Sequence, residues 1–115
     1  MIKTQERPDL KAIEKDWRGR GFSFGIWTDP PGQVWSNYVH DADELFLVLE
    51  GLVELELEGE ILRPDPGVEI LIPARAPHTV RNAGNVVSRW LYGYNVMPGR
   101  PYSSGRPVSP GSPSF

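Results

Sequence analysis

The stretch from Gly32 to Gly51 reads GQVWSNYVHDADELFLVLEG, and a second stretch from Gly67 to Asn82 reads GVEILIPARAPHTVRN. Each stretch contains one of the two histidines of the chain. A carboxylate, Glu44, follows closely after the histidine of the first stretch. Histidines used so sparingly, with a carboxylate nearby, indicate a functional site, because imidazole is the commonest metal ligand and acid–base group in proteins.

Short strands separated by turn residues make up these stretches and the segments around them. Apolar runs bounded by Gly, Pro, Asn and Asp predict strands over residues 22–28, 34–40, 45–49, 52–58, 61–63, 68–72, 78–82 and 86–95. The run over 45–49 is continuously apolar, which predicts a strand buried on both faces. The run over 52–58 alternates with glutamates, and we expect this acidic row to face solvent and to discourage edge-to-edge pairing. The pattern is typical of an all-β sandwich or small barrel.

The N-terminal part differs from this β pattern. Asp9 is a candidate N-cap for a short helix that would place Leu10, Ile13 and Trp17 on one face. A helix of this length is marginal on its own, so we expect it to lie across the β domain.

The C-terminal part differs as well. Residues 98–115 are mostly Pro, Gly and Ser, which predicts either a disordered tail or an extended arm over a partner subunit, with Tyr102 and Phe115 as anchors. We therefore expect one domain over residues 1–97, with a short N-terminal helix or extended segment, followed by a flexible tail.

The composition is that of an ordinary globular domain. The chain has 115 residues, of which 39% are hydrophobic and 23% charged, and its formal net charge is −3. This balance gives no basic surface for nucleic acid, and no apolar run approaches the ~20 residues that span a bilayer. The first residues are too polar for a secretory signal, and the absence of cysteine excludes disulfides and thiolate metal sites. We expect a cytoplasmic protein without nucleic-acid or membrane partners.

Side chains from both stretches form a candidate metal site. Successive strand residues point to opposite faces, so Tyr38 and His40 share a face, and Glu44 follows where the chain enters the next strand. If the strand that carries His78 is a neighbour in a barrel, His40, Glu44 and His78 converge. Two imidazoles and a carboxylate suit iron, manganese, nickel, zinc or copper. The alternative for an isolated pair of histidines is a surface or hydrogen-bonded role.

The spacing resembles the two signature motifs of the cupin superfamily. The two stretches read G-x5-Y-x-H-x3-E-x6-G and G-x5-P-x-R-x2-H-x3-N, where the family has G-x5-H-x-H-x3,4-E-x6-G and G-x5-P-x-G-x2-H-x3-N. Two positions depart, because Tyr38 replaces the first histidine and Arg75 replaces a glycine. The short span between the motifs and the phrase over residues 43–51 are especially similar to small bacterial single-domain cupins of the cupin 2 conserved barrel type.

The resemblance covers roughly residues 22–96 and implies a double-stranded β-helix, or jelly roll, with one divalent metal ion at its mouth. The ligands carried over by position are His40, Glu44 and His78, with Tyr38 in the fourth place as a possible further ligand. The resemblance also implies a homodimer.

Further side chains are candidates for the site. Aromatic residues are more numerous than packing requires, so Phe46, Trp90 and Tyr92 could line a ligand pocket beside the metal, and Arg75 could reach an anionic ligand. Tyr38 is a candidate catalytic residue, as a hydrogen-bond donor to substrate or as an acid–base group.

These features support two main hypotheses. The first is a metal-dependent enzyme acting on a small organic molecule, by oxygenase-like chemistry or by Lewis-acid chemistry such as isomerisation, with Fe, Mn, Ni or Zn as the ion. The alternative is a non-catalytic cupin that binds or senses a small molecule, its metal site weakened or lost because Tyr38 replaces a ligand. A purely structural or storage barrel is a third interpretation.

Overall fold

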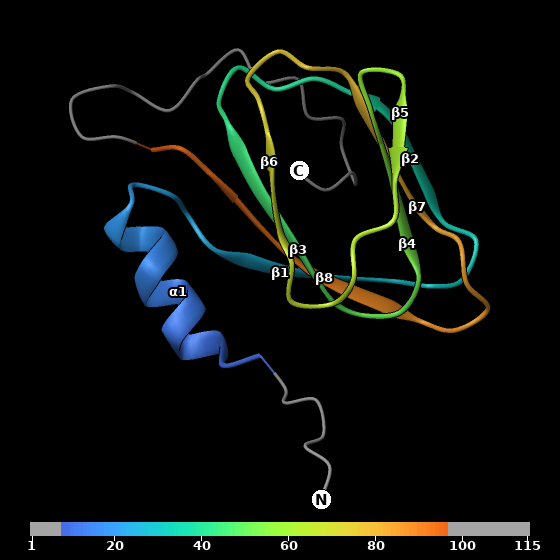
Figure 1. The fold of residues 1–115 in the computed structure, drawn as a ribbon, viewed down its shortest axis with the longest axis horizontal. Coiled ribbons are helices and arrows are strands. Elements are labelled where there is room, and N and C mark those ends of the chain that lie inside the picture. Colours follow the sequence, from blue (N-terminus) through green and yellow to red (C-terminus); the bar gives the residue numbers. More distant parts are fainter. Residues whose placement is uncertain (1–7, 97–115) are drawn as a thin grey trace, which may run out of the picture.

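The computed structural model describes residues 8–96, whose strands form two four-stranded antiparallel sheets that face each other (Figure 1). One sheet has the order β1-β8-β3-β6 and the other the order β2-β7-β4-β5. The elements in chain order are α1 (Leu10–Gly19), β1 (Gly25–Asp29), β2 (Val34–Tyr38), β3 (Glu44–Glu50), β4 (Val53–Leu57), β5 (Glu60–Leu62), β6 (Glu69–Ile72), β7 (His78–Asn82) and β8 (Ser88–Tyr94). Because the chain passes repeatedly from one sheet to the other, this is the predicted jelly roll, and the all-β prediction is confirmed.

Parts of the predictions concern residues beyond this range. The domain boundary at residue 97 and the tail over 98–115 lie outside the described residues. Between residues 8 and 96, no helix has both the length and the apolar character needed to cross a membrane.

Helix α1 lies against the outer face of the β1-β8-β3-β6 sheet, as its apolar side predicts (Figure 1). Asp9 is the N-cap, and its carboxylate accepts a hydrogen bond from a backbone N–H of the first turn at 3.1 Å. Trp17 is fully buried, and its indole N–H donates to Glu69 of β6 at 3.1 Å. Its cluster on the sheet contains Leu45, Leu47 and Leu91. The sheet therefore supplies the stability that so short a helix lacks alone.

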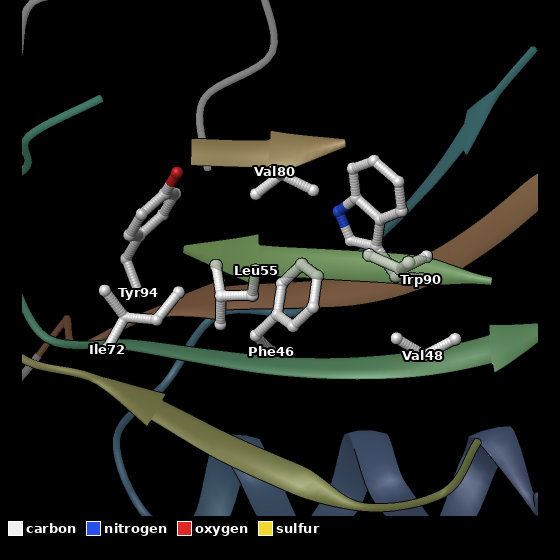
Figure 2. Close-up of a cluster of buried hydrophobic side chains, with 8 residues drawn as sticks. Phe46, Val48, Leu55, Ile72, Val80, Trp90 and Tyr94 are labelled. Carbon is white, nitrogen blue, oxygen red and sulfur yellow. The ribbon is translucent and has the colours of Figure 1, made fainter. Parts of the chain in front are cut away.

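The main hydrophobic core lies between the two sheets. Its buried members are Phe46, Val48, Val53, Leu55, Ile72, Val80, Trp90 and Tyr94. Figure 2 shows Tyr94 and Trp90 at opposite ends of this cluster. Strand β3 is buried on both faces, as predicted, because alternate residues face this core and the cluster under α1. Both clusters depend on β3, which is therefore the central strand of the fold.

The acidic row of residues 52–58 was expected to face solvent and to discourage edge-to-edge pairing, but it does not lie at a sheet edge. Strand β4 lies between β7 and β5 and is not an edge strand. Glu54 and Glu56 lie on its outer face, where they form ion pairs with Arg81 of the neighbouring β7. Arg63 pairs with Glu54 at 2.9 Å from the other side. The glutamates therefore belong to a cross-strand charge ladder, since opposite charges on neighbouring strands stabilise a sheet.

Candidate metal centre

His40 lies in the connection between β2 and β3, and Glu44 lies at its end. His40 follows shortly after the last residue of β2, and Glu44 is the first residue of β3. Both side chains are buried, with relative exposures of 3% for His40 and 0% for Glu44. Glu44 pairs with Ile72 of β6 on one side and with Tyr94 of β8 on the other. Its side chain therefore projects from an inner strand of the sheet.

His78 comes from the opposite sheet, where it begins β7. Its backbone pairs with Tyr38 of β2 and Leu57 of β4. The ring nitrogen Nδ1 lies 3.0 Å from the carbonyl oxygen of Ala76. Because a carbonyl oxygen only accepts, Nδ1 carries the proton, and Nε2 presents its lone pair toward Glu44. The bend before β7 therefore sets both the position and the tautomer of His78.

The three side chains meet between the sheets, as predicted. Nε2 of His40 lies 3.8 Å from Oε1 of Glu44, and Nε2 of His78 lies 3.6 Å from the same oxygen. All three ligand atoms lie within 4.8 Å of one another. Metal–ligand bonds of about 2.0–2.2 Å place two ligands of one ion at most about 4.2 Å apart. Both nitrogen–oxygen distances meet this limit. A small movement of the two imidazoles toward each other would bring all three ligand atoms within it.

The state of Glu44 provides a test of whether an ion fits here. Both of its carboxylate oxygens are buried, and neither accepts a hydrogen bond from any residue between 8 and 96. Burial raises the pKa of Glu44 well above its ordinary value. A carboxylate taken out of water without hydrogen bonds is costly unless it binds a cation or a proton. The donor set of two imidazole nitrogens and this carboxylate therefore fits a divalent transition-metal ion.

Hydrogen bonds hold the two loops of the site together. The backbone N–H of Arg75 donates to the carbonyl oxygen of His40 at 2.6 Å. The backbone N–H of Ala74 donates to Oδ1 of Asp43 at 2.8 Å, and that of Asn95 to the carbonyl oxygen of Asp43 at 2.9 Å. The loop before His78 is thus fastened to the loop that carries His40.

The departure of Arg75 from the family motif has a conformational cost. Its backbone φ is +67°, in the left-handed region that glycine adopts freely, and its side chain is exposed. The motif glycine at this position therefore suits the turn. Whether the Arg75 side chain reaches a ligand stays a prediction.

Replacing Arg75 by glycine is expected to stabilise the fold by about 0.5–1 kcal/mol. A left-handed conformation costs a residue with a Cβ about 1–2 kcal/mol, partly offset by the larger backbone freedom that glycine loses on folding. Urea unfolding of Arg75→Gly and Arg75→Ala checks this, because alanine removes the charge but keeps the Cβ. Equal stability of the two variants would contradict the explanation.

Tyr38 and Tyr94 hold different places beside His40. The Tyr38 and His40 rings are stacked, with centroids 6.2 Å apart and planes only 6° apart. The hydroxyl of Tyr94 lies 3.3 Å from Nε2 of His40. Metal ligation or catalysis by Tyr38 stays a prediction, whereas sequence reasoning missed Tyr94 as a site residue. The sequence pattern that could have identified Tyr94 is the alternation of Trp90, Tyr92 and Tyr94, which places all three side chains on the inner face of β8.

The predicted pocket residues lie in two different environments. Phe46 and Trp90 are fully buried core side chains. Tyr92 is half-buried and lies over Gly25 of β1, where an added Cβ would approach its ring to 2.8 Å. Burial, and after it the negative charge of Glu44, raise the pKa of Tyr92, which links this phenol electrostatically to the site. The role of these residues in binding a ligand stays a prediction.

Comparisons with known proteins agree with this architecture. TT1209 from Thermus thermophilus is similar with a TM-score of 0.61 and 29% identity, over 67% of this chain and 74% of that chain. A predicted oxalate decarboxylase (tm1287) from Thermotoga maritima is similar with a TM-score of 0.61 and 19% identity, over 72% of this chain and 74% of that chain. A salicylate 1,2-dioxygenase from Pseudaminobacter salicylatoxidans has a TM-score of 0.61 and 22% identity, over 65% of this chain but 22% of that chain. The last two likenesses concern the fold alone.

The family assignment rests on a comparison of the sequence with models of known families. No match was found among curated proteins. A family model described as a cupin domain matches residues 25–94, which include both histidine stretches. Since this match spans more than half of the chain, the protein belongs to the cupin family.

Proposed function

We propose that this cupin binds one divalent transition-metal ion through His40, Glu44 and His78, and uses it to act on a small organic molecule. The observation that carries the proposal is the carboxylate of Glu44, which is fully buried, accepts no hydrogen bond from the part of the chain that the structure describes, and faces two imidazole nitrogens. A bound ion would supply Lewis-acid polarisation of a substrate oxygen or activation of dioxygen.

The residues around the ion have separate tasks in this proposal. His78 is held in the metal-binding tautomer by its hydrogen bond to Ala76. The apolar core beside Glu44 excludes water, which strengthens every charge interaction within the site. Tyr38, half-buried and stacked on His40, is the proposed hydrogen-bond donor or acid–base group toward the substrate.

The second candidate function is non-catalytic binding or sensing of a small molecule. It is favoured by the stacking of Tyr38 on His40, where the family motif has a further histidine ligand. The homodimer implied by the cupin resemblance is proposed for either function. Consumption of dioxygen in a single turnover would support the enzyme, whereas ligand binding without turnover would support the sensor.

The first experiment is the metal content of untagged protein purified without chelator. We expect near-stoichiometric metal in the wild type and loss of about 100-fold or more in affinity for the double variant His40→Ala/His78→Ala, because removing even outer-shell support costs 10–100-fold. Glu60→Gln is the matched control, since Glu60 is an exposed carboxylate on β5. Circular dichroism verifies that the double variant folds. A wild type that is empty and also refuses added Fe(II), Mn(II), Ni(II) and Zn(II) would overturn the metal proposal.

A further inference from the structure

We propose that Tyr94 supplies a fourth protein donor to the metal, an oxygen from β8 that lies outside both histidine stretches. This inference rests on the proposed function, because it concerns the same ion. It assigns to Tyr94 the place that the family motif gives to the histidine replaced by Tyr38.

The sheet register places Tyr94 beside Glu44. The two residues are cross-strand partners on β8 and β3, so their side chains leave the same face of the sheet. Tyr94 is only 4% exposed, and Figure 2 shows its hydroxyl at one end of the core cluster. Its ring meets the His40 ring at a centroid distance of 4.8 Å and an angle of 64°. The phenol is therefore fixed at the site by packing on both sides.

The contact between Tyr94 and His40 is incompatible with a metal bond at the same nitrogen. The phenol oxygen lies 3.3 Å from Nε2 of His40. If Nε2 accepts this hydrogen bond, its lone pair is occupied, and if Nε2 donates, its proton has to leave before an ion can bind. In both cases an ion at Nε2 replaces the hydrogen bond and arrives next to the phenol oxygen. This separation is shorter than the span of about 4.2 Å that two ligands of one ion allow.

Tyr38 is placed for a different task. Its ring is nearly parallel to the imidazole of His40, whereas the ring of Tyr94 meets the imidazole edge on. A parallel ring packs against the face of the imidazole and fixes its orientation. The lone pair of Nε2 lies in the imidazole plane, and the hydroxyl of Tyr94 is in contact with that atom. Toward the ion, Tyr38 thus acts through its ring on the orientation of His40, and the role proposed for its hydroxyl toward the substrate is unchanged.

A tyrosine donor changes the class of ion that the centre prefers. When the oxygen of Tyr94 bonds to the ion, its proton passes to solvent, and the protein then contributes two anionic oxygens and two neutral nitrogens. Hard, anionic oxygen ligands favour iron and manganese over softer ions. A Tyr94 phenolate would favour Fe(III) in particular, because it would add a second negative charge to the ligand set.

The test compares single hydroxyl deletions in the full chain. Wild type, Tyr94→Phe, Tyr38→Phe and Tyr92→Phe are loaded with Fe(II) without oxygen and then oxidised in air, and the visible phenolate-to-Fe(III) charge-transfer band is recorded. We expect the band in the wild type and in the Tyr38 and Tyr92 variants, and its loss in Tyr94→Phe. Titration with Mn(II) should show binding at least ~10-fold weaker for Tyr94→Phe, with the other two variants close to wild type.

Each outcome decides the inference. A band that persists in Tyr94→Phe, a band that disappears in Tyr38→Phe or Tyr92→Phe, or iron bound to the wild type without a band would overturn the assignment to Tyr94 and leave the metal proposal intact. A wild type that binds neither ion would overturn both. If Tyr94→Phe does not fold, the Tyr38 and Tyr92 variants still decide, because loss of the band in either one assigns the ligand to that residue.

Discussion

Replacing Glu44 by glutamine is expected to make the metal-free protein more stable at neutral pH while removing the proposed metal binding. The carboxylate is fully buried and has no hydrogen bond to any of the described residues, and burial raises its pKa well above the ordinary value. At neutral pH the folded apoprotein must therefore either hold a proton on Glu44 or bury a charge, and both are unfavourable. Glutamine has nearly the same shape and no charge, so we expect a gain of about 1–2 kcal/mol, of the size seen when functional residues are removed.

The pH dependence gives the sign of this effect. Because the pKa of Glu44 is higher in the folded state, its protonation favours folding below the ordinary carboxylate pKa, and this contribution is lost as the pH rises through the raised value. Urea unfolding of the apoprotein in chelator, from acidic to neutral pH, should therefore show a decline in the wild type that Glu44→Gln lacks. Glu60→Gln, at an exposed position, should keep the decline. A Glu44→Gln variant that is less stable than wild type at neutral pH would contradict the account.

Replacing Gly93 by alanine is expected to destabilise the protein by about 3 kcal/mol or more. A Cβ at this position of β8 would overlap the backbone oxygen of Ser23, and it would approach the Trp17 ring to 3.0 Å. Neither obstacle is the free end of a flexible side chain, because one is main chain and the other is a fully buried indole under α1. To relieve this overlap, the segment before β1 would have to move away from the sheet, and this movement would disrupt the packing of the helix.

The matched control is alanine at Gly19, at the end of α1. An added Cβ meets nothing within 4 Å there, and alanine is a better helix former than glycine by up to about 1 kcal/mol. The same substitution should therefore be strongly destabilising at residue 93 and neutral or stabilising at residue 19. Thermal and urea unfolding measure both variants. Equal midpoints for the two would refute the view that close contact with the segment before β1 requires glycine at residue 93.

The strands and the closeness of His40 to Glu44 could be predicted because their signals are local. The apolar run over 45–49 specifies a doubly buried strand, and the spacing of His40 and Glu44 places both in one strand connection. His78 joined them on the condition that its strand is a neighbour in a barrel, and the motif resemblance supplied that condition, since the pairing of β7 with β2 is a contact between distant parts of the chain. Periodicity alone indicates which face a residue occupies but not which strand lies opposite.

Strand order accounts for most of what the sequence did not predict. Glu54 and Glu56 were expected to face solvent and to discourage edge-to-edge pairing, because no local signal shows that β5 pairs with their strand. Tyr94 was missed as a site residue because its place beside Glu44 depends on the register between β3 and β8. The strained turn at Arg75 was not predicted for another reason. The tertiary structure imposes a positive φ there, and arginine is not a residue type that indicates a positive φ.

The main chain at residues 74 and 75, rather than their side chains, sets the spacing of the two histidine loops. The donors to Asp43 and His40 are backbone N–H groups, which every residue type except proline provides. Side chains at these two positions can therefore drift in evolution, or be redesigned, without displacing a ligand as long as Asp43 is kept. A designer could use these two positions to carry a new charge or a spectroscopic label to the edge of the proposed centre.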